Sequence, residues 1–210
     1  MSVIYRTSEE QLDRIRDEEA LRFHAYPDPE SALARGTRGV RWGFGRASEL
    51  RALLPVTVQL LDGKPWTIGY GTTVYPNGKK VMPDDECTID QADLYLRNFV
   101  GNLEADVNEA ITNDVLTQPM FDALISMAYN VGAGAFVRSS LVRHINAGAW
   151  INAQREFDLW VNAGGMKSGG LVKRRNREQQ QFNDGIRYVL KDAPEVLALF
   201  NEFVELTNIG

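Results

Sequence analysis

The chain has 210 residues, of which 44% are hydrophobic and 24% charged, a composition typical of a folded protein with one core. It excludes disorder and collagen-like repeats, and the single cysteine, Cys87, excludes a disulfide scaffold. Lys and Arg number 23 against 28 Asp and Glu, and the resulting charge of −5 argues against nucleic acid as a partner.

The start of the chain, MSVIYRTSEE, lacks the basic head and apolar stretch of a signal peptide, so we expect synthesis in a cytoplasm. The longest run without a charge, 123–137, is too short and too polar to cross a bilayer, which predicts no stable membrane insertion. Only His24 and His144 could add imidazole ligands to one thiol, so we expect neither a structural metal nor a cofactor.

Apolar periodicity and capping residues predict a mostly helical chain. Ser8 with Gln11 forms a capping box at the first helix, and Thr88 with Gln91 opens a long helix whose apolar stripe includes Phe99. Further helices are expected at Thr117–Gly132, 141–145, 150–161 and 171–185, with a last one after Pro194 that carries Val196, Leu199, Phe200 and Phe203 on its core face.

Glycine, proline and β-branched residues concentrate between Tyr26 and Met82. Residues 66–71 and 72–75 predict short strands, and Asn77-Gly78 predicts a tight hairpin turn. Together these features indicate a small sheet lobe beside a larger set of helices.

Three features do not fit a purely structural role. Glu19 continues the apolar stripe of the first helix, and with Asp28 it would supply the two carboxylates that glycoside hydrolysis requires, although a lone Glu at a helix end is more often turned to solvent. The segment 67–71, TIGYG, offers the Thr67 hydroxyl and two glycines, which a hairpin strand would explain equally well. A basic helix start at 169–178 cannot direct all its arginines to solvent, so at least one should turn inward.

Five segments in order resemble the phage-type lysozymes, the endolysins of glycoside hydrolase family 24. They are EEALRFHAYPD (18–28), WTIGYG (66–71), FDALISMAYNVGAGAF (121–136), SSLVRHINAG (139–148) and GLVKRR (170–175). The resemblance covers about residues 8–185 and implies one lysozyme-like α+β domain over 1–210. In it, an antiparallel sheet lobe (about 20–86) and a helical lobe (about 88–210 plus the first helix) would enclose an active-site cleft.

The same resemblance implies hydrolysis of the β-1,4 bond between N-acetylmuramic acid and N-acetylglucosamine in peptidoglycan. Glu19 would be the general acid, and Asp28 with Thr67 would position water on the opposite face of the sugar, so that the anomeric centre inverts. Inversion suits carboxyl groups about 6.5–9.5 Å apart. Arg174 matches the arginine that pairs with the glutamate, with Arg175 one step away.

Host cell lysis is also implied, with the chain made in the cytoplasm of an infected bacterium and reaching the periplasm through a holin-type lesion. We expect a monomer, because nothing in the sequence demands a larger assembly. Two alternatives stay open. A lytic transglycosylase needs the acid but no positioned water, so the presence of Asp28 and Thr67 speaks against it. A non-catalytic wall-binding or virion structural relative is disfavoured because all three catalytic positions, Glu19 included, are retained.

The chain departs from the family pattern in three places. Ala20 stands where glycine is usual, and Thr72 stands where histidine is common. The largest departure is an insert at about 30–62, which leaves Asp28 and Thr67 39 positions apart.

Charge and aromatic residues mark the insert as more than a spacer. It carries five arginines against three acids, a net of +2; they are Arg35, Arg38, Arg41, Arg46 and Arg51 against Glu30, Glu49 and Asp62. Residues 46–54 predict one short helix, and Trp42 and Phe44 lie beside glycines where rings can be exposed. We hypothesise that the insert extends the sheet lobe and contacts glycan or the acidic wall surface; a packed decoration with no binding role fits the sequence equally well.

Overall fold

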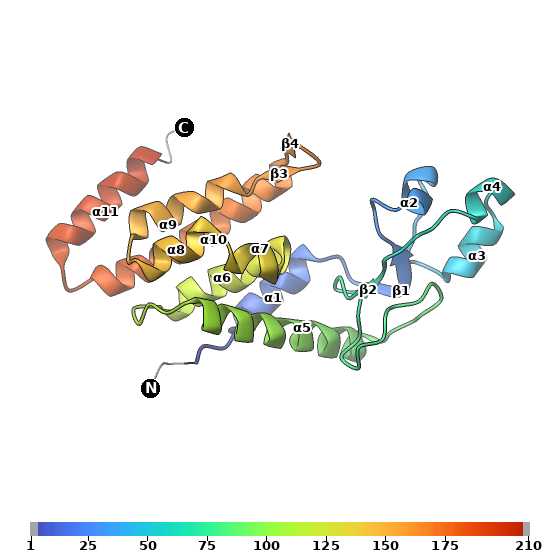
Figure 1. Cartoon of the computed structure of the whole chain (residues 1–210), viewed down its shortest axis with the longest axis horizontal. Coiled ribbons are helices and arrows are strands. Elements are labelled where there is room, and N and C mark those ends of the chain that lie inside the picture. Colours follow the sequence, from blue (N-terminus) through green and yellow to red (C-terminus); the bar gives the residue numbers. More distant parts are fainter. Residues whose placement is uncertain (1–3, 208–210) are drawn as a thin grey trace. The chain divides into compact units, whose positions relative to one another are not determined.

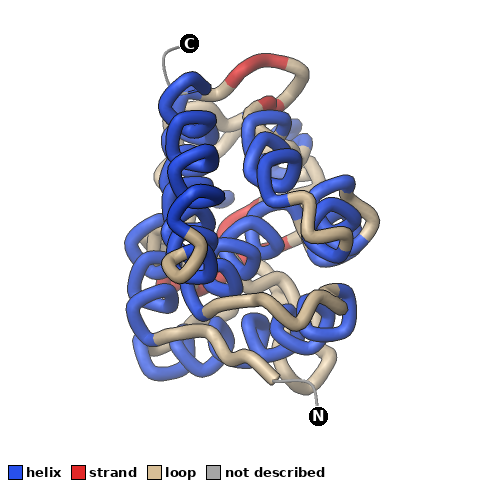
Figure 2. Tube along the Cα trace, turned by 90° about the vertical axis from the view of Figure 1, so that its left-hand side faces the viewer, coloured by secondary structure: helices blue, strands red, loops and turns tan. Residues whose placement is uncertain are grey.

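A computed structural model describes residues 4–207. Helices dominate it and the strands are short (Figures 1 and 2), which confirms the expected α+β class. The chain divides into two compact units, with boundaries after Leu12 and after Val100. We call the part from Asp13 to Val100 the sheet unit and the remainder the helical unit.

The helical unit is built on two long helices, α6 (Gln118–Val131) and α10 (Gly169–Leu190), which pack against each other. Gly185 permits this packing, because a side chain there would collide with Thr117 and Met120 of the α6 start. Shorter elements complete the unit: α7 (Ala133–Val137), α8 (Ser140–Asn146), α9 (Trp150–Glu156), a 3-10 turn (Phe157–Leu159), the paired strands β3 (Asn162–Ala163) and β4 (Met166–Lys167), and α11 (Pro194–Thr207).

The predicted helix starts are largely confirmed. At the start of α5 (Ile89–Ala110), the Gln91 amide donates to Thr88 Oγ1 at 3.2 Å and the Thr88 amide donates to Gln91 Oε1 at 2.9 Å, which is the expected reciprocal capping box. Gly132, with φ of +85°, ends α6 as predicted.

Three residues assigned to core stripes are exposed, and those predictions are wrong. Phe99 is 47% exposed, because the buried face of α5 runs through its neighbour Val100 and through residues one turn away. On α11, Val196 and Leu199 are 51% and 67% exposed. This helix buries the face that carries Phe200 and Val204 instead; these two residues lie four positions apart.

The sheet unit pairs β1 (Arg22–Pro27) with β2 (Trp66–Gly69) in antiparallel fashion. The strand predicted at 66–71 is therefore confirmed in its first four residues, whereas 72–75 forms only isolated bridges, because Gly69 and Gly71 turn the chain with φ of +63° and +95°. The turn at Asn77-Gly78 is present, with the Gly78 amide donating to Tyr75 O at 2.9 Å.

The insert folds into three short helices between these strands. They are α2 (Ala32–Gly36), α3 (Ala47–Ala52), which confirms the helix predicted at 46–54, and α4 (Val56–Gln59). In the sheet unit, α3 contacts β1 and α2 contacts α4.

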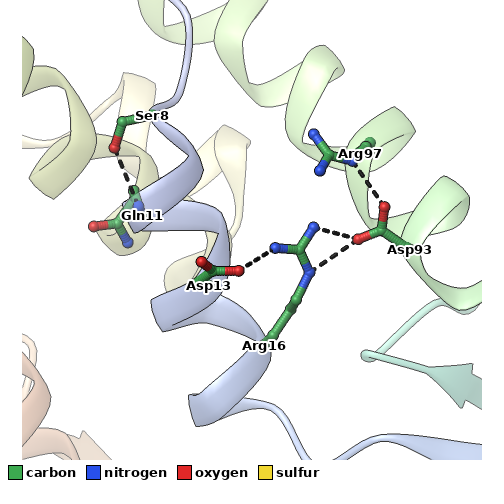
Figure 3. Close-up of polar contacts among 6 residues, drawn as sticks. All are labelled: Ser8, Gln11, Asp13, Arg16, Asp93 and Arg97. Carbon is green, nitrogen blue, oxygen red and sulfur yellow. Dashed lines mark hydrogen bonds and ion pairs between the residues drawn. The ribbon is translucent and has the colours of Figure 1, made fainter. Parts of the chain in front are cut away.

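Polar contacts cap the first helix, α1 (Glu9–Glu18), and hold its C-terminal half to α5 (Figure 3). Ser8 Oγ accepts a hydrogen bond of 3.1 Å from the Gln11 amide, which is half of the predicted capping box. The Ser8 amide donates to Asp122 Oδ1 at 3.0 Å instead of to the Gln11 side chain. Further along, Arg16 Nε donates to the Asp93 carboxylate at 2.9 Å, and Arg97 Nε donates to the same carboxylate at 2.8 Å. The end of α1 is thereby fixed to α5.

The described part of the chain contains neither a membrane-spanning helix nor a metal-binding cluster. None of its helices combines the length and the apolar character that a bilayer crossing requires. Residues 4–207 also bring together no group of three or more His, Cys, Asp or Glu side chains that could hold a metal ion.

Candidate active site

Glu19 is the first residue beyond α1. Its amide donates to Ile15 O at 2.9 Å, so the helical path continues to this point, and Ile15 itself is fully buried. The Glu19 side chain is half-buried and lines a pocket of about 630 Å³ in the sheet unit. The carboxylate that the apolar stripe singled out is therefore at a cavity, where a ligand can reach it.

Strand pairing brings the neighbourhoods of Asp28 and Thr67 together despite the insert. Tyr26 lies opposite Thr67, and Pro27 lies opposite Trp66. Directly after β1, the Asp28 amide donates to Gly63 O at 3.2 Å and to Pro65 O at 3.0 Å. The insert therefore leaves and re-enters the sheet unit at adjacent points, and it does not separate the two residues in space.

The alternation of side chains along a strand orients these groups. Residues two apart on an extended chain share a face, so Asp28 lies on the same side as Tyr26. Thr67, the partner of Tyr26 across the ladder, projects to that side too. The Asp28 carboxylate accepts a 2.7 Å hydrogen bond from the Glu30 amide, which fixes its orientation in a local turn, and Thr67 is only 7% exposed.

The charges of Glu19 and Asp28 both affect the pKa of the Tyr26 phenol. Burial raises the pKa of Tyr26, the negative charge of Glu19 raises it further, Arg22 opposes the rise, and Asp28 adds to it. Tyr26 lines the same pocket as Glu19, lies opposite Thr67 in the ladder and precedes Asp28 by two residues. Residues predicted from two separate motifs, 18–28 and 67–71, are thus related through one side chain.

The pocket beside Glu19 is lined mostly by the insert. Its lining consists of Glu19, Ala20, Arg22, Tyr26, Pro27, Pro29, Ala34, Thr37, Arg38, Gly39, Val40, Arg41, Trp42, Phe44 and Gly71. Phe44 is exposed, as expected for a ring beside glycines, whereas Trp42 is half-buried against Trp66. A protonated carboxyl group beside such a pocket can donate its proton to a leaving oxygen, and an ionised carboxylate can hold a water molecule.

The basic segment at the start of α10 turns inward, as predicted. Arg174 is 7% exposed and Arg175 is fully buried. Arg174 Nε lies 3.3 Å from Glu178 Oε1, and Arg175 Nε lies 2.7 Å from Glu178 Oε2. Ser126 Oγ donates to Glu178 Oε1 at 2.6 Å. The sequence analysis did not single out Glu178, and the pairing of Arg174 with Glu19 stays a prediction.

Sequence reasoning missed Tyr26 and Arg22 as members of the site. Both lie on β1, a strand that was not predicted because its six residues contain few β-branched or strictly alternating apolar side chains. The position of Tyr26 two residues before Asp28 was the available signal, since recognition of the strand would have placed both on one face.

Comparisons with known proteins agree with the sequence resemblance. The Phage lysozyme family model matches residues 54–178, a range that contains Thr67 and Arg174 and begins after Glu19 and Asp28. The endolysin of Bacillus phage PZA is 45% identical over 122 residues, which are 58% of this chain and 45% of that protein. The match therefore spans less than half the length of this relative.

Solved structures extend the likeness over most of the chain. The endolysin from Escherichia coli O157:H7 phage FAHEc1 has a TM-score of 0.63 and 28% identity, covering 87% of this chain and 96% of its own. The muramidase domain of SpmX from Asticaccaulis excentricus has a TM-score of 0.60 and 25% identity, covering 85% and 97%. The expected lysozyme-like fold is confirmed.

Proposed function

This chain belongs to the phage lysozyme family, and we propose that it is a peptidoglycan-degrading muramidase of the endolysin type. Its reaction is the hydrolysis of the β-1,4 bond between N-acetylmuramic acid and N-acetylglucosamine. The muramidase domain to which the chain is similar supports this bond as the target. The observation that supports the proposal is that Tyr26, which precedes Asp28 by two residues, pairs with Thr67 and lines the same pocket as Glu19.

In the proposed reaction, Glu19 protonates the glycosidic oxygen as the bond to the leaving sugar breaks. Positive charge develops at the anomeric carbon, and a water molecule attacks it from the other face. Asp28 accepts a proton from this water and the Thr67 hydroxyl helps to orient it. The hydrogen bond from the Glu30 amide keeps the Asp28 carboxylate in place, and the product is a reducing sugar of inverted configuration.

Outside the sheet unit, we propose that Arg174 supports Glu19 as its charge partner. The chain would act as a monomer on the walls of its host, accumulating in the cytoplasm of the infected bacterium until a holin-type lesion admits it to the periplasm. The phage endolysins to which the chain is similar support the host wall as the place of action.

Two isosteric variants test the assigned roles. Glu19→Gln removes the proton donor and should lower the release of reducing ends from purified sacculi by about a hundredfold to ten-thousandfold. Glu10→Gln, at the exposed first turn of the same helix, is its control and should retain full activity. A Glu19→Gln protein that still releases reducing ends at the wild-type rate would remove Glu19 from the acid role.

Asp28→Asn should likewise abolish hydrolysis, because an amide is a poor acceptor for a proton from water. Asp62 offers a closely matched control, since Asp62 Oδ1 accepts from the Lys64 amide at 3.0 Å in the same kind of turn. Asp62 does not directly follow β1, where Tyr26 pairs with Thr67. Equal rates for Asp28→Asn and Asp62→Asn would contradict the role of Asp28.

A further inference from the structure

We propose that Arg22, Arg38 and Arg41 form a binding site for the carboxylates of the peptide stems that peptidoglycan strands carry. The site lies on the side of the Glu19 pocket that the insert forms. It rests on the proposed function, because the glycan whose stems it would bind is the strand cleaved at Glu19.

Hydrogen bonds and ring packing hold this side of the pocket in place. Trp42 Nε1 donates to Thr37 Oγ1 at 2.9 Å, and the same hydroxyl donates to Leu33 O at 2.7 Å. Leu33 is fully buried, and the Trp42 ring meets the Trp66 ring edge-on with centroids 6.2 Å apart. Because Trp66 belongs to β2, the turn that carries the two arginines of the insert is anchored to the strand that also carries Thr67.

The guanidinium groups of Arg38 and Arg41, which this turn carries, are available to bind a ligand. Arg38 and Arg41 are exposed, and neither forms a hydrogen bond or ion pair with any of residues 4–207. Two other arginines of the insert are engaged: Arg46 Nε lies 2.5 Å from Glu86 Oε1, and Arg51 donates to two main-chain oxygens at 3.0 and 3.1 Å. Arg35 also has an exposed side chain, but it lies outside the pocket lining, whereas Arg38 and Arg41 are part of that lining.

The Phe44 ring brings the guanidinium groups of Arg22 and Arg41 close together. Phe44 lies under two guanidinium carbons, that of Arg22 at 4.6 Å and that of Arg41 at 4.4 Å from the ring centroid. Gly43 makes this possible, because its φ is +84° and a Cβ there would lie 2.6 Å from Arg22 Cδ. With Glu19 as the one acid of the lining, the pocket is locally positive in a chain whose net charge is −5.

The chemistry of the ligand follows from these donors. Guanidinium groups bind carboxylates through paired, charge-assisted hydrogen bonds. The sugar rings of a peptidoglycan strand carry hydroxyl and acetamido groups, which are neutral, whereas its negative charge resides on the carboxylates of the peptide stems. Three arginines beside the cleaving acid therefore suit a strand that still carries its peptides.

The test compares two substrates made from one preparation: intact glycan strands, and the same strands freed of peptides by an amidase. Because the amidase leaves a free lactyl carboxylate on each N-acetylmuramic acid, these carboxylates are then converted to neutral amides. The double variant R38Q/R41Q should lose about tenfold in kcat/KM on peptide-bearing strands, the effect of one lost charge-assisted hydrogen bond. On stripped strands it should match the wild type. Arg35→Gln removes an exposed arginine of the same insert outside the pocket lining and should change neither rate.

Two results would overturn the proposed site: an unchanged rate on peptide-bearing strands, or an equal loss on both substrates at an unchanged unfolding midpoint. A wild-type protein that cleaves neither substrate would instead contradict the proposed function. In that event, binding of peptide-bearing strands by Glu19→Gln still decides the matter, since adding R38Q/R41Q should weaken it about tenfold. Equal binding with and without these two changes would refute the site.

Discussion

Tyr26 shows at the level of a single residue how the two carboxylates of the proposed site are related. A nearby negative charge disfavours the phenolate, so removing either charge should lower the pKa of Tyr26. We expect this decrease in both Glu19→Gln and Asp28→Asn, measured by alkaline titration of the tyrosine ring carbons by NMR. Asp62→Asn should leave the pKa of Tyr26 where it is. A value that stays constant in all three variants would contradict the grouping of Glu19 and Asp28 around the ring.

Glu178 is the second residue with a decisive electrostatic role. It contacts both Arg174 and Arg175, and its side chain is 4% exposed. Burial raises the pKa of Glu178, while Arg175, the Ser126 hydroxyl and Arg174 oppose the rise. Replacing Glu178 by Gln leaves two buried cations without their carboxylate.

Glu178→Gln should therefore lower the free energy of unfolding by about 3–5 kcal/mol, measured by urea unfolding. Asp184→Asn on the same helix breaks an exposed pair with Arg187 and should cost no more than about 1 kcal/mol. A loss at Glu178 no larger than that at Asp184 would contradict the importance of the buried cluster.

Among the elements, α1 and α5 are joined by a pH-dependent contact at Asp93. Burial alone would raise the pKa of Asp93, but the hydrogen bonds from Arg97 and Arg16 outweigh it and hold the pKa below its ordinary value. A carboxyl with a lower pKa in the folded chain stabilises the fold above its unfolded pKa, and this contribution disappears as the pH falls through the folded value.

At neutral pH, Asp93→Asn should lower the free energy of unfolding by about 1 kcal/mol or less. This difference from the wild type should shrink as the pH falls from about 5 to about 3. Urea unfolding followed by circular dichroism at several pH values measures it. Asp106→Asn, an exposed position of α5, should show no such trend. A difference for Asp93 that is constant or grows on acidification would contradict the ion pairs.

Elements with local signals were predictable from the sequence, and those that depend on distant partners were not. The cap at Ser8 and the capping box at Thr88 are formed within four residues of chain, and the sequence predicts both helix starts. Strand β1 forms because β2 pairs with it, and β2 begins 39 positions after the end of β1. The six residues of β1 do not show a strand pattern of their own. The exposed Leu199 has a similar cause, since tertiary packing decides which face of α11 is buried.

For the molecule as a whole, the candidate site was predictable as a set of residues but not as a geometry. Short motifs marked Glu19, Asp28 and Thr67, whereas the insert obscured their relation. Main-chain hydrogen bonds from Asp28 to Gly63 and Pro65 show why the insert is tolerated, because it begins and ends at neighbouring points. The composition of the insert suggested contact with glycan or the acidic wall surface. Which of its arginines line the Glu19 pocket could not be predicted, since that depends on how the insert folds.

The central claim is that this chain hydrolyses the glycan through a carboxylic acid and a positioned water. Mass spectrometry of the muropeptides released from purified Gram-negative sacculi tests it most directly. Hydrolysis with water held by Asp28 and Thr67 predicts fragments that end in reducing N-acetylmuramic acid. Fragments that end in the anhydro sugar, or no release from accessible sacculi, would contradict it.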